Sequence, residues 1–168
     1  MHMQRLTAWI SSRSLEIMGR EADRLYPLET GGVLIGYWAD DTNVVVTAEF
    51  GPGPAAIHKR YSYKHDHAWE AARVASEYER SERTHVYIGD WHTHPNASSG
   101  RLSGTDKRSL RTVLGSQEAR LRRTLMVVLF GTSTEWQPDI WAAELGRASI
   151  WNWRRSLLIE PVLLRRYT

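Results

Sequence analysis

The chain has 168 residues, of which 42% are hydrophobic and 24% are charged, and its formal net charge is +3. This length and composition are typical of a soluble globular protein of about one domain. The chain contains no cysteine, which excludes a disulfide framework, a cysteine nucleophile and a thiolate zinc site. A metal in this protein would therefore need imidazole and carboxylate ligands.

The sequence gives little support to a membrane or nucleic-acid role. The longest uninterrupted apolar run, Leu125 to Phe130, is far shorter than the roughly 20 residues that span a bilayer. The segment Met1 to Leu6 lacks the apolar core of a secretory signal. We therefore expect a cytoplasmic protein without a membrane partner. Because basic residues such as Arg122-Arg123 are scattered among acidic ones, we expect a solvated surface rather than a nucleic-acid partner.

The first part of the chain alternates between helical and strand patterns. Apolar residues recur at steps of three and four from Ser14 to Tyr26, which predicts an amphipathic helix ending before Pro27. Two β-branched runs, Gly32 to Trp38 and Val44 to Phe50, then predict a hairpin. A break rich in glycine and proline separates this hairpin from a third strand, which is expected over His58 to Lys64.

A second helix is expected after Asp66, because a carboxylate at this position can cap a helix start. The helix is predicted to run to about Arg83. One face of it is expected to carry Trp69, Ala72 and Ser76.

Strand patterns dominate the rest of the chain. Val86 to Trp91 predicts a strand that runs into a His-Thr-His-Pro segment, and a helix begins near Ser103. Leu125 to Phe130 predicts a buried strand, with Asp139 to Leu145 as its neighbour.

The last residues fit a strand and a helix equally, although Trp151, Trp153 and Leu157 to Ile159 must cover apolar surface. The whole pattern predicts a single-domain α/β/α sandwich over residues 1–168, with a mixed sheet flanked by helices. Its core is expected to hold three tryptophans, rather than expose them along a substrate groove: Trp38, Trp69 and Trp91.

A His-x-His pair followed by an acidic residue is the main candidate for chemistry. His92 and His94 are two residues apart on a predicted strand, so both imidazoles point to the same side and can converge on one ion. A catalytic zinc usually takes three protein ligands and leaves a fourth position for water. Asp106, at the start of the next helix, can supply the third ligand. Without a metal, the pair is a chance repeat and Ser103 to Asp106 is a helix-capping pair.

A second His-x-His, His65-Asp66-His67, offers a comparison. It lies at a predicted helix start, where residues two apart diverge. We interpret it as a helix cap with exposed histidines, rather than as a metal site.

Together these residues resemble the JAMM family (also called JAB or MPN) of zinc-dependent isopeptidases. The family motif is His-x-His-Pro, a spacer and Ser-x-x-Asp, which matches His92 to Pro95 and Ser103 to Asp106. An upstream Glu-x-Gly-Gly segment of the family matches Glu29 to Gly36. The resemblance covers roughly Leu15 to Phe130. The spacer, residues 95–102, is one residue longer than usual, which a surface loop accommodates at little cost.

The resemblance implies a role for each motif residue. His92, His94 and Asp106 would bind one Zn²⁺, whose charge lowers the pKa of bound water to about 7. Glu29 would take a proton from that water and pass it to the leaving lysine amine, which typically contributes roughly 10²–10⁴-fold. Ser103 would donate to the oxyanion. Outside the family, Glu29 is a solvated turn residue before two glycines, and capping explains Ser103 nearly as well.

The resemblance also implies a substrate class and partners. Family members cleave the bond between the C-terminus of a ubiquitin-like protein and a lysine of the conjugated protein. With its short length and the segment Glu29 to Gly36, this chain also resembles bacterial peptidases found beside ubiquitin-activating-like and ubiquitin-conjugating-like enzymes, in CBASS and related anti-phage operons. The strand edges between Val44 and Tyr63 could pair with an extended substrate tail.

Three alternatives remain at this point. A processing peptidase for a sulfur-carrier or ubiquitin-like precursor would use the same site. A non-catalytic MPN scaffold would normally lack one of the ligands, and all of them are present here. A nucleoside or nucleic-acid deaminase can share a related architecture, but its standard form needs cysteine ligands, which the chain lacks.

Overall fold

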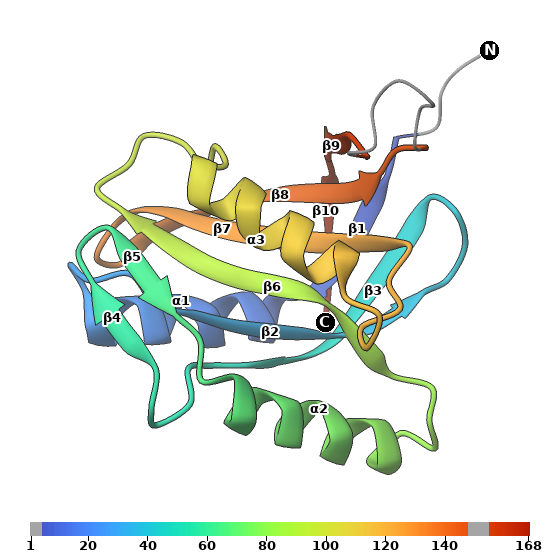
Figure 1. The fold of residues 1–168 in the computed structure, drawn as a ribbon. Coiled ribbons are helices and arrows are strands. Elements are labelled where there is room, and N and C mark those ends of the chain that lie inside the picture. The colour runs from blue at the N-terminus through green and yellow to red at the C-terminus, as the bar shows by residue number, and fades with distance from the viewer. Residues whose placement is uncertain (1–4, 148–154) are drawn as a thin grey trace.

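The computed structural model describes residues 5–147 and 155–168. An eight-stranded mixed sheet, with the strand order β10-β1-β3-β2-β6-β7-β8-β9, forms its centre, and a two-stranded hairpin lies beside it (Figure 1). The helices are α1 (Ser12–Leu25), α2 (His67–Arg80) and α3 (Gly104–Gly115). The strands are β1 (Thr7–Ser11), β2 (Gly31–Trp38), β3 (Asn43–Phe50), β4 (Ile57–Lys59), β5 (Ser62–Lys64), β6 (Val86–Pro95), β7 (Arg123–Thr132), β8 (Glu135–Leu145), β9 (Leu157–Pro161) and β10 (Leu163–Tyr167).

Helices cover both faces of the sheet, which confirms the predicted α/β/α sandwich. Met18 and Ala22 of α1 pack in one apolar cluster with Val127 of β7. Leu110 of α3 packs in a second cluster with Val128, the next residue of the same strand. Because successive residues of a strand face opposite sides, α1 and α3 lie on opposite faces. Side chains of α2 and α3 border one cavity over β2 and β6, so α2 lies on the same side as α3.

Side chains cap the first two helices. The Oγ of Ser11 accepts a hydrogen bond from the N–H of Ser14 at 2.9 Å, so α1 starts before the predicted Ser14. Asp66 caps α2 as predicted, but this helix ends at Arg80 rather than near Arg83.

The face of α2 that carries Trp69, Ala72 and Ser76 is mostly open to solvent, because Trp69 is half-buried and the other two are exposed. The buried residues of this helix are Glu70 and Glu77. Each buried carboxylate has a polar partner; Glu77, for example, accepts from Nε of Arg80 at 2.8 Å. Pairing of this kind allows charged groups to occupy an inward face that apolar residues would normally fill.

Most predicted strands are confirmed, with three differences. The single strand expected over His58 to Lys64 is the hairpin β4–β5. β3 lies between β1 and β2, so it has no free edge for a substrate tail. β1, β9 and β10 were not predicted, and β9 shows that Leu157 to Ile159 is a strand. Trp151 and Trp153 lie outside the described residues.

The tryptophans only partly follow the prediction. Trp91 is fully buried. Trp38 is half-buried at the edge of the core, and Trp69 is half-buried with its ring edge-to-face against Phe50. In the described residues, no helix is both long enough and apolar enough to cross a membrane.

Candidate metal centre and active site

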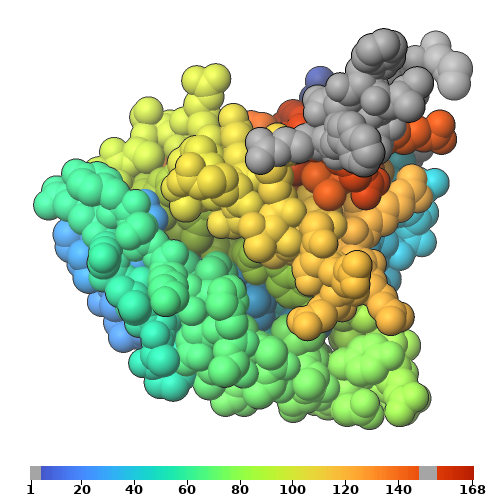
Figure 2. Space-filling view, viewed as in Figure 1, coloured from blue at the N-terminus to red at the C-terminus, as the bar shows by residue number. Residues whose placement is uncertain are grey.

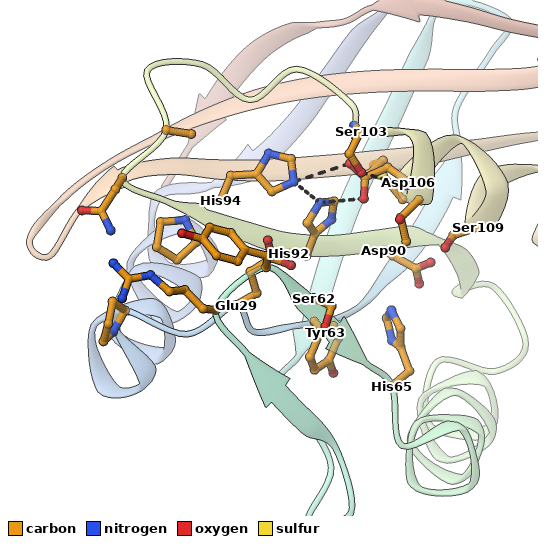
Figure 3. Close-up of a pocket in the computed structure, with 18 residues that line it drawn as sticks. Glu29, Ser62, Tyr63, His65, Asp90, His92, His94, Ser103, Asp106 and Ser109 are labelled. Carbon is orange, nitrogen blue, oxygen red and sulfur yellow. Dashed lines mark hydrogen bonds and ion pairs between the residues drawn. The ribbon is translucent and has the colours of Figure 1, made fainter.

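β6 and α3 bring the three predicted ligands together. The Nε2 atoms of His92 and His94 lie 3.0 Å apart. The Asp106 carboxylate places Oδ1 3.2 Å from Nε2 of His92 and Oδ2 3.4 Å from Nε2 of His94 (Figure 3). Among the described residues, this is the one group of three histidine or acidic side chains with ligand atoms close enough to share an ion.

Local structure explains this convergence. His92 and His94 alternate with Thr93 on β6, so their rings share one face of the strand. Asp106 is the third residue of α3 and forms a full capping box with Ser103: each accepts a hydrogen bond from the backbone N–H of the other, at 3.1 Å and 2.6 Å. The capping interpretation of Ser103 and Asp106 is therefore correct, and the same carboxylate also faces both histidines.

The donor set fits a tetrahedral metal ion. Atoms that bind one zinc ion at about 2.0–2.1 Å in tetrahedral geometry lie about 3.3 Å from one another. Here the two imidazole nitrogens lie 3.0 Å apart, and each faces one oxygen of Asp106: Oδ1 lies 3.2 Å from His92 and Oδ2 lies 3.4 Å from His94. Two imidazoles and one carboxylate are also the donor types of hydrolytic zinc sites that leave one position open.

The three groups are coupled electrostatically. Burial raises the pKa of Asp106, but hydrogen bonds from His92 and His94 outweigh it and hold that pKa well below its usual range. Burial lowers the pKa of His94, and the hydrogen bond to Asp106 reverses the effect, so that the pKa is raised. The carboxylate therefore stays ionised and can attract the positive charge of a protonated His94 or of a metal ion.

Glu29 is held beside this cluster by its backbone. Its N–H donates to the carbonyl of Lys59 at 2.8 Å, and its carbonyl lies 3.0 Å from Nδ1 of His58, which must carry the proton. The next residue, Thr30, donates its N–H to Oγ1 of Thr93 at 2.9 Å and accepts from the N–H of Thr93 at 2.8 Å. The β4–β5 hairpin and the residue between the two histidines thus fix the position of Glu29, and the sequence analysis identified neither.

The two glycines after Glu29 allow β2 to approach its neighbours closely. A Cβ at Gly31 would overlap the carbonyl oxygen of Trp91, and one at Gly32 would overlap that of Phe50. The Glu-x-Gly-Gly segment is therefore a packing requirement that keeps the glutamate next to β6.

A cavity of about 640 Å³ contains all five predicted site residues. The hairpin, β6 and α3 border it; the hairpin and α3 flank a hollow with β6 between them (Figure 2). Burial raises the pKa of Glu29 to about 7, while the nearby His94 lowers it and Asp106 raises it further. Glu29 is thus a half-buried carboxyl that can exchange a proton near neutral pH, and the solvated-turn interpretation is wrong. The residues that line the cavity include Glu29, His92, His94, Ser103 and Asp106.

The comparison pair, His65 and His67, does not belong to the metal cluster. His67 is exposed as expected, but the His65 side chain is only 22% exposed, and its Nδ1 lies 2.7 Å from Oε1 of the buried Glu70. The expected divergence is also wrong, because the two rings stack with centroids 5.6 Å apart. His65 precedes the helix, so its direction is not set by helical geometry.

Comparison with known proteins identifies the family. A mixed sheet flanked by helices, with a His-His-Asp cluster beside a half-buried glutamate, has the fold and donor set of a metal-dependent hydrolase. A family model described as prokaryotic homologs of the JAB domain matches residues 11–144. The chain therefore belongs to the JAB (JAMM) family, as its motifs predicted, and is an enzyme of the metalloprotease class.

Relatives of known name support this membership. The chain is 43% identical over 154 residues to "Probable metalloprotease y4qB" of Sinorhizobium fredii, which covers 92% of this chain and 90% of that protein. It is 36% identical over 102 residues to a "CD-NTase/cGAS isopeptidase" of Vibrio cholerae, covering 61% of this chain and 64% of that protein. The solution structure of protein DSY2949 from Desulfitobacterium hafniense has the same fold, with a TM-score of 0.62, 15% identity and coverage of 96% and 94%.

Proposed function

We propose that this protein is a zinc-dependent isopeptidase that releases a ubiquitin-like protein from a lysine of the protein to which it is conjugated. The proposal rests on one observation: a His-His-Asp cluster and a half-buried glutamate share one cavity. The name of the Vibrio cholerae relative, "CD-NTase/cGAS isopeptidase", supports an isopeptide bond as the target. It also supports a conjugation operon as the source of partners.

His92, His94 and Asp106 would hold the ion. When bound, Zn²⁺ would lower the pKa of a water molecule and polarise the substrate carbonyl. Asp106 contributes a carboxylate that stays ionised, because its pKa lies well below the usual range. The capping bond from the N–H of Ser103 fixes the orientation of this carboxylate.

Glu29 is the proposed general base and acid. Its carboxylate takes a proton from the attacking water and delivers it to the lysine nitrogen as the carbon–nitrogen bond breaks. In the metal-free site burial already raises the pKa of Glu29 to about 7, so this carboxyl can both accept and release a proton near neutral pH. Ser103 accepts a hydrogen bond from the N–H of Asp106 through Oγ, so its hydroxyl hydrogen remains able to donate to the developing oxyanion.

The hairpin offers a path for the substrate tail. Glu29 bonds to the backbone of β4 at Lys59. In the described residues β5 pairs with β4 alone and contributes Ser62 and Tyr63 to the lining of the cavity. An extended C-terminal tail could therefore add to the edge of β5 and reach the metal centre.

The decisive experiment replaces Glu29 with glutamine, which fills the same space but cannot carry the proton. We expect Glu29→Gln to keep the fold and the zinc content. It should cleave a lysine-linked conjugate of the cognate modifier at least about 10²-fold more slowly, because loss of a general base typically lowers the rate by roughly this factor or more. Cleavage at the wild-type rate would show that the proposed mechanism is wrong, however firmly zinc is bound.

A second function, the maturation of a precursor, is supported by the broader match to a protein named a metalloprotease rather than an isopeptidase. The same site would then cut a peptide bond after the C-terminal residue of a ubiquitin-like or sulfur-carrier protein. The two functions are separated by supplying the wild-type protein with a linear precursor and with a lysine-linked conjugate of the same modifier. Faster cleavage of the linear precursor would favour maturation.

A further inference from the structure

A loop of residues 96–102 joins the two halves of the metal centre. His94 precedes it on β6, and Ser103 and Asp106 follow it at the start of α3 (Figure 1). The position of Asp106 relative to the histidines therefore depends on the path of this loop, as well as on the packing of α3.

Strand β8 holds the loop at one residue, Gly100, through both of its backbone groups. The N–H of Gly100 donates to Oδ2 of Asp139 at 2.8 Å, and its carbonyl accepts from Nε1 of Trp141 at 2.8 Å. Gly100 is buried, and a Cβ there would lie 2.7 Å from the Cβ of Asp139 and 3.1 Å from Cδ1 of Phe130. The loop can approach β8 this closely only because the residue has no side chain.

The register of the sheet links this contact to the metal centre. His92 pairs with Val128 on β7, and Val128 pairs with Asp139 on β8. Paired residues of neighbouring strands face the same side of a sheet. Asp139 therefore lies level with His92, two strands away, and both side chains are on the same face of the sheet.

We propose that Asp139, together with Trp141, is a positioning residue for the metal centre. The two side chains hold Gly100 through its N–H and its carbonyl. Because Ser103 follows only three residues later, these bonds also restrict the position of Ser103. The N–H of Ser103 in turn donates at 2.6 Å to Oδ2 of Asp106, the oxygen that faces His94. This inference rests on the proposed function only for the position of the metal.

The test measures Zn²⁺ affinity in the full chain by competition with a chelator, and amide hydrogen exchange by NMR. Loss of a group that orients a metal ligand typically weakens binding by roughly 10–100-fold. We expect Asp139→Ala to raise the Zn²⁺ Kd by roughly tenfold or more. Exchange at the Gly100 amide should speed up, and the Ser103 amide resonance should shift. Asp139→Asn keeps an acceptor oxygen and should bind Zn²⁺ nearly as well as the wild type.

Asp23 provides a matched control. Its Oδ1 accepts from the N–H of Thr134 at 2.7 Å and from Nε1 of Trp136 at 2.8 Å. As at Asp139, a carboxylate accepts a loop or turn N–H, but Asp23 also accepts the indole itself, and it ties the β7–β8 turn to α1 on the opposite face of the sheet. Asp23→Ala should therefore lower the melting temperature and leave the Zn²⁺ Kd unchanged.

The outcomes separate a positioning role from a purely structural one. If Asp139→Ala behaves like Asp23→Ala, with a lower melting temperature but the wild-type Kd and Ser103 resonance, the proposal is overturned. If Asp139→Ala does not fold, Trp141→Phe keeps an aromatic ring but removes the N–H that donates to Gly100. An unchanged Kd and Ser103 resonance in that variant would overturn the proposal. Weaker Zn²⁺ binding in a protein that cleaves no conjugate would support the positioning role while contradicting the proposed function.

Discussion

The backbone N–H of Ser103 donates at 2.6 Å to the same carboxylate oxygen of Asp106 that lies 3.4 Å from Nε2 of His94. One hydrogen bond of the helix cap is thus also a contact that orients a candidate metal ligand. Because it comes from the backbone, this bond can survive any substitution of Ser103 except proline, which has no N–H. The hydroxyl can therefore be removed without taking away the group that holds Asp106.

The first prediction uses this separation. Ser103→Ala should keep zinc, because the backbone N–H still orients Asp106. It should lower kcat by roughly 10²–10³-fold, the usual effect of removing one oxyanion donor, and lower the free energy of unfolding by about 1 kcal/mol through the lost cap. Metal content, conjugate cleavage and urea unfolding measure the three quantities.

Ser11→Ala is the matched control, because Ser11 caps α1 through the same type of bond, at 2.9 Å to the N–H of Ser14. It should lower stability by a similar amount, about 1 kcal/mol, and leave kcat unchanged. Equal rates in the Ser103 and Ser11 variants would mean that Ser103 is a cap and nothing more.

The second prediction concerns the location of the metal. His92→Ala removes one of the three proposed ligands and should abolish stoichiometric zinc binding, as measured by metal analysis after gel filtration. Joint replacement of His65 and His67 by alanine should leave the zinc content unchanged. The double variant should still be less stable, because the buried Glu70 loses the ring 2.7 Å away. Zinc lost from the double variant but retained by His92→Ala would place the metal elsewhere.

The third prediction concerns Thr93, the residue between the two histidines. Thr93→Val conserves shape but removes the Oγ1 that accepts from the N–H of Thr30 at 2.9 Å. We expect kcat to fall by roughly tenfold or more, because a displacement of about 1 Å can cost up to about 10²-fold, and Thr30 follows Glu29 directly. Zinc content should not change.

Thr124 supplies the comparison for this change. It is fully buried, and its Oγ1 donates to the carbonyl of Ile88 at 3.2 Å on the same sheet. Thr124→Val should lower stability through the lost bond, with kcat close to the wild-type value. A similar loss of kcat in both variants would attribute the effect to general destabilisation rather than to the position of Glu29.

The candidate ligands could be predicted from sequence because their geometry is local. His92 and His94 lie on one strand, and Asp106 follows after one short loop, so strand periodicity and a helix cap nearly determine where they point. The groups that hold Glu29 could not be predicted in this way. Thr30 pairs with Thr93, and the hairpin reaches Glu29 from residues about thirty positions away.

The same distinction explains the errors in the fold. β1 pairs in parallel with β10, with Thr7 opposite Leu163, and no local pattern encodes a register between residues so far apart. The buried residues of α2 were also not predicted. Glu70 is buried, and its carboxylate lies 2.7 Å from Nδ1 of His65, a residue outside the helix. Both features depend on contacts that form only when distant segments meet.

Glu29 should also affect how the stability of the protein changes with pH, which can be measured without a substrate. In the metal-free protein its pKa is raised from 4.5 to about 7 by burial, so the folded state binds its proton more tightly than the unfolded state does. Ionisation of Glu29 therefore makes folding less favourable as the pH rises from about 4.5 to about 7, and the loss is complete above that range. Glutamine is always neutral, so a glutamine at this position does not cause this loss of stability at high pH.

The last prediction follows from that sign. In chelator-treated protein, Glu29→Gln should raise the melting temperature at about pH 8 but change it little at about pH 4.5, where Glu29 is protonated in the folded state.

Glu77→Gln is the control of opposite sign, because the hydrogen bond from Arg80 lowers the pKa of Glu77. Its stabilisation is present above the unfolded pKa and is lost in acid, so this variant should be destabilised at about pH 8 and less so at about pH 4.5. Calorimetry at the two pH values distinguishes them. If Glu29→Gln raises the melting temperature equally at the two pH values, Glu29 is not held as a half-buried carboxyl beside the proposed metal centre.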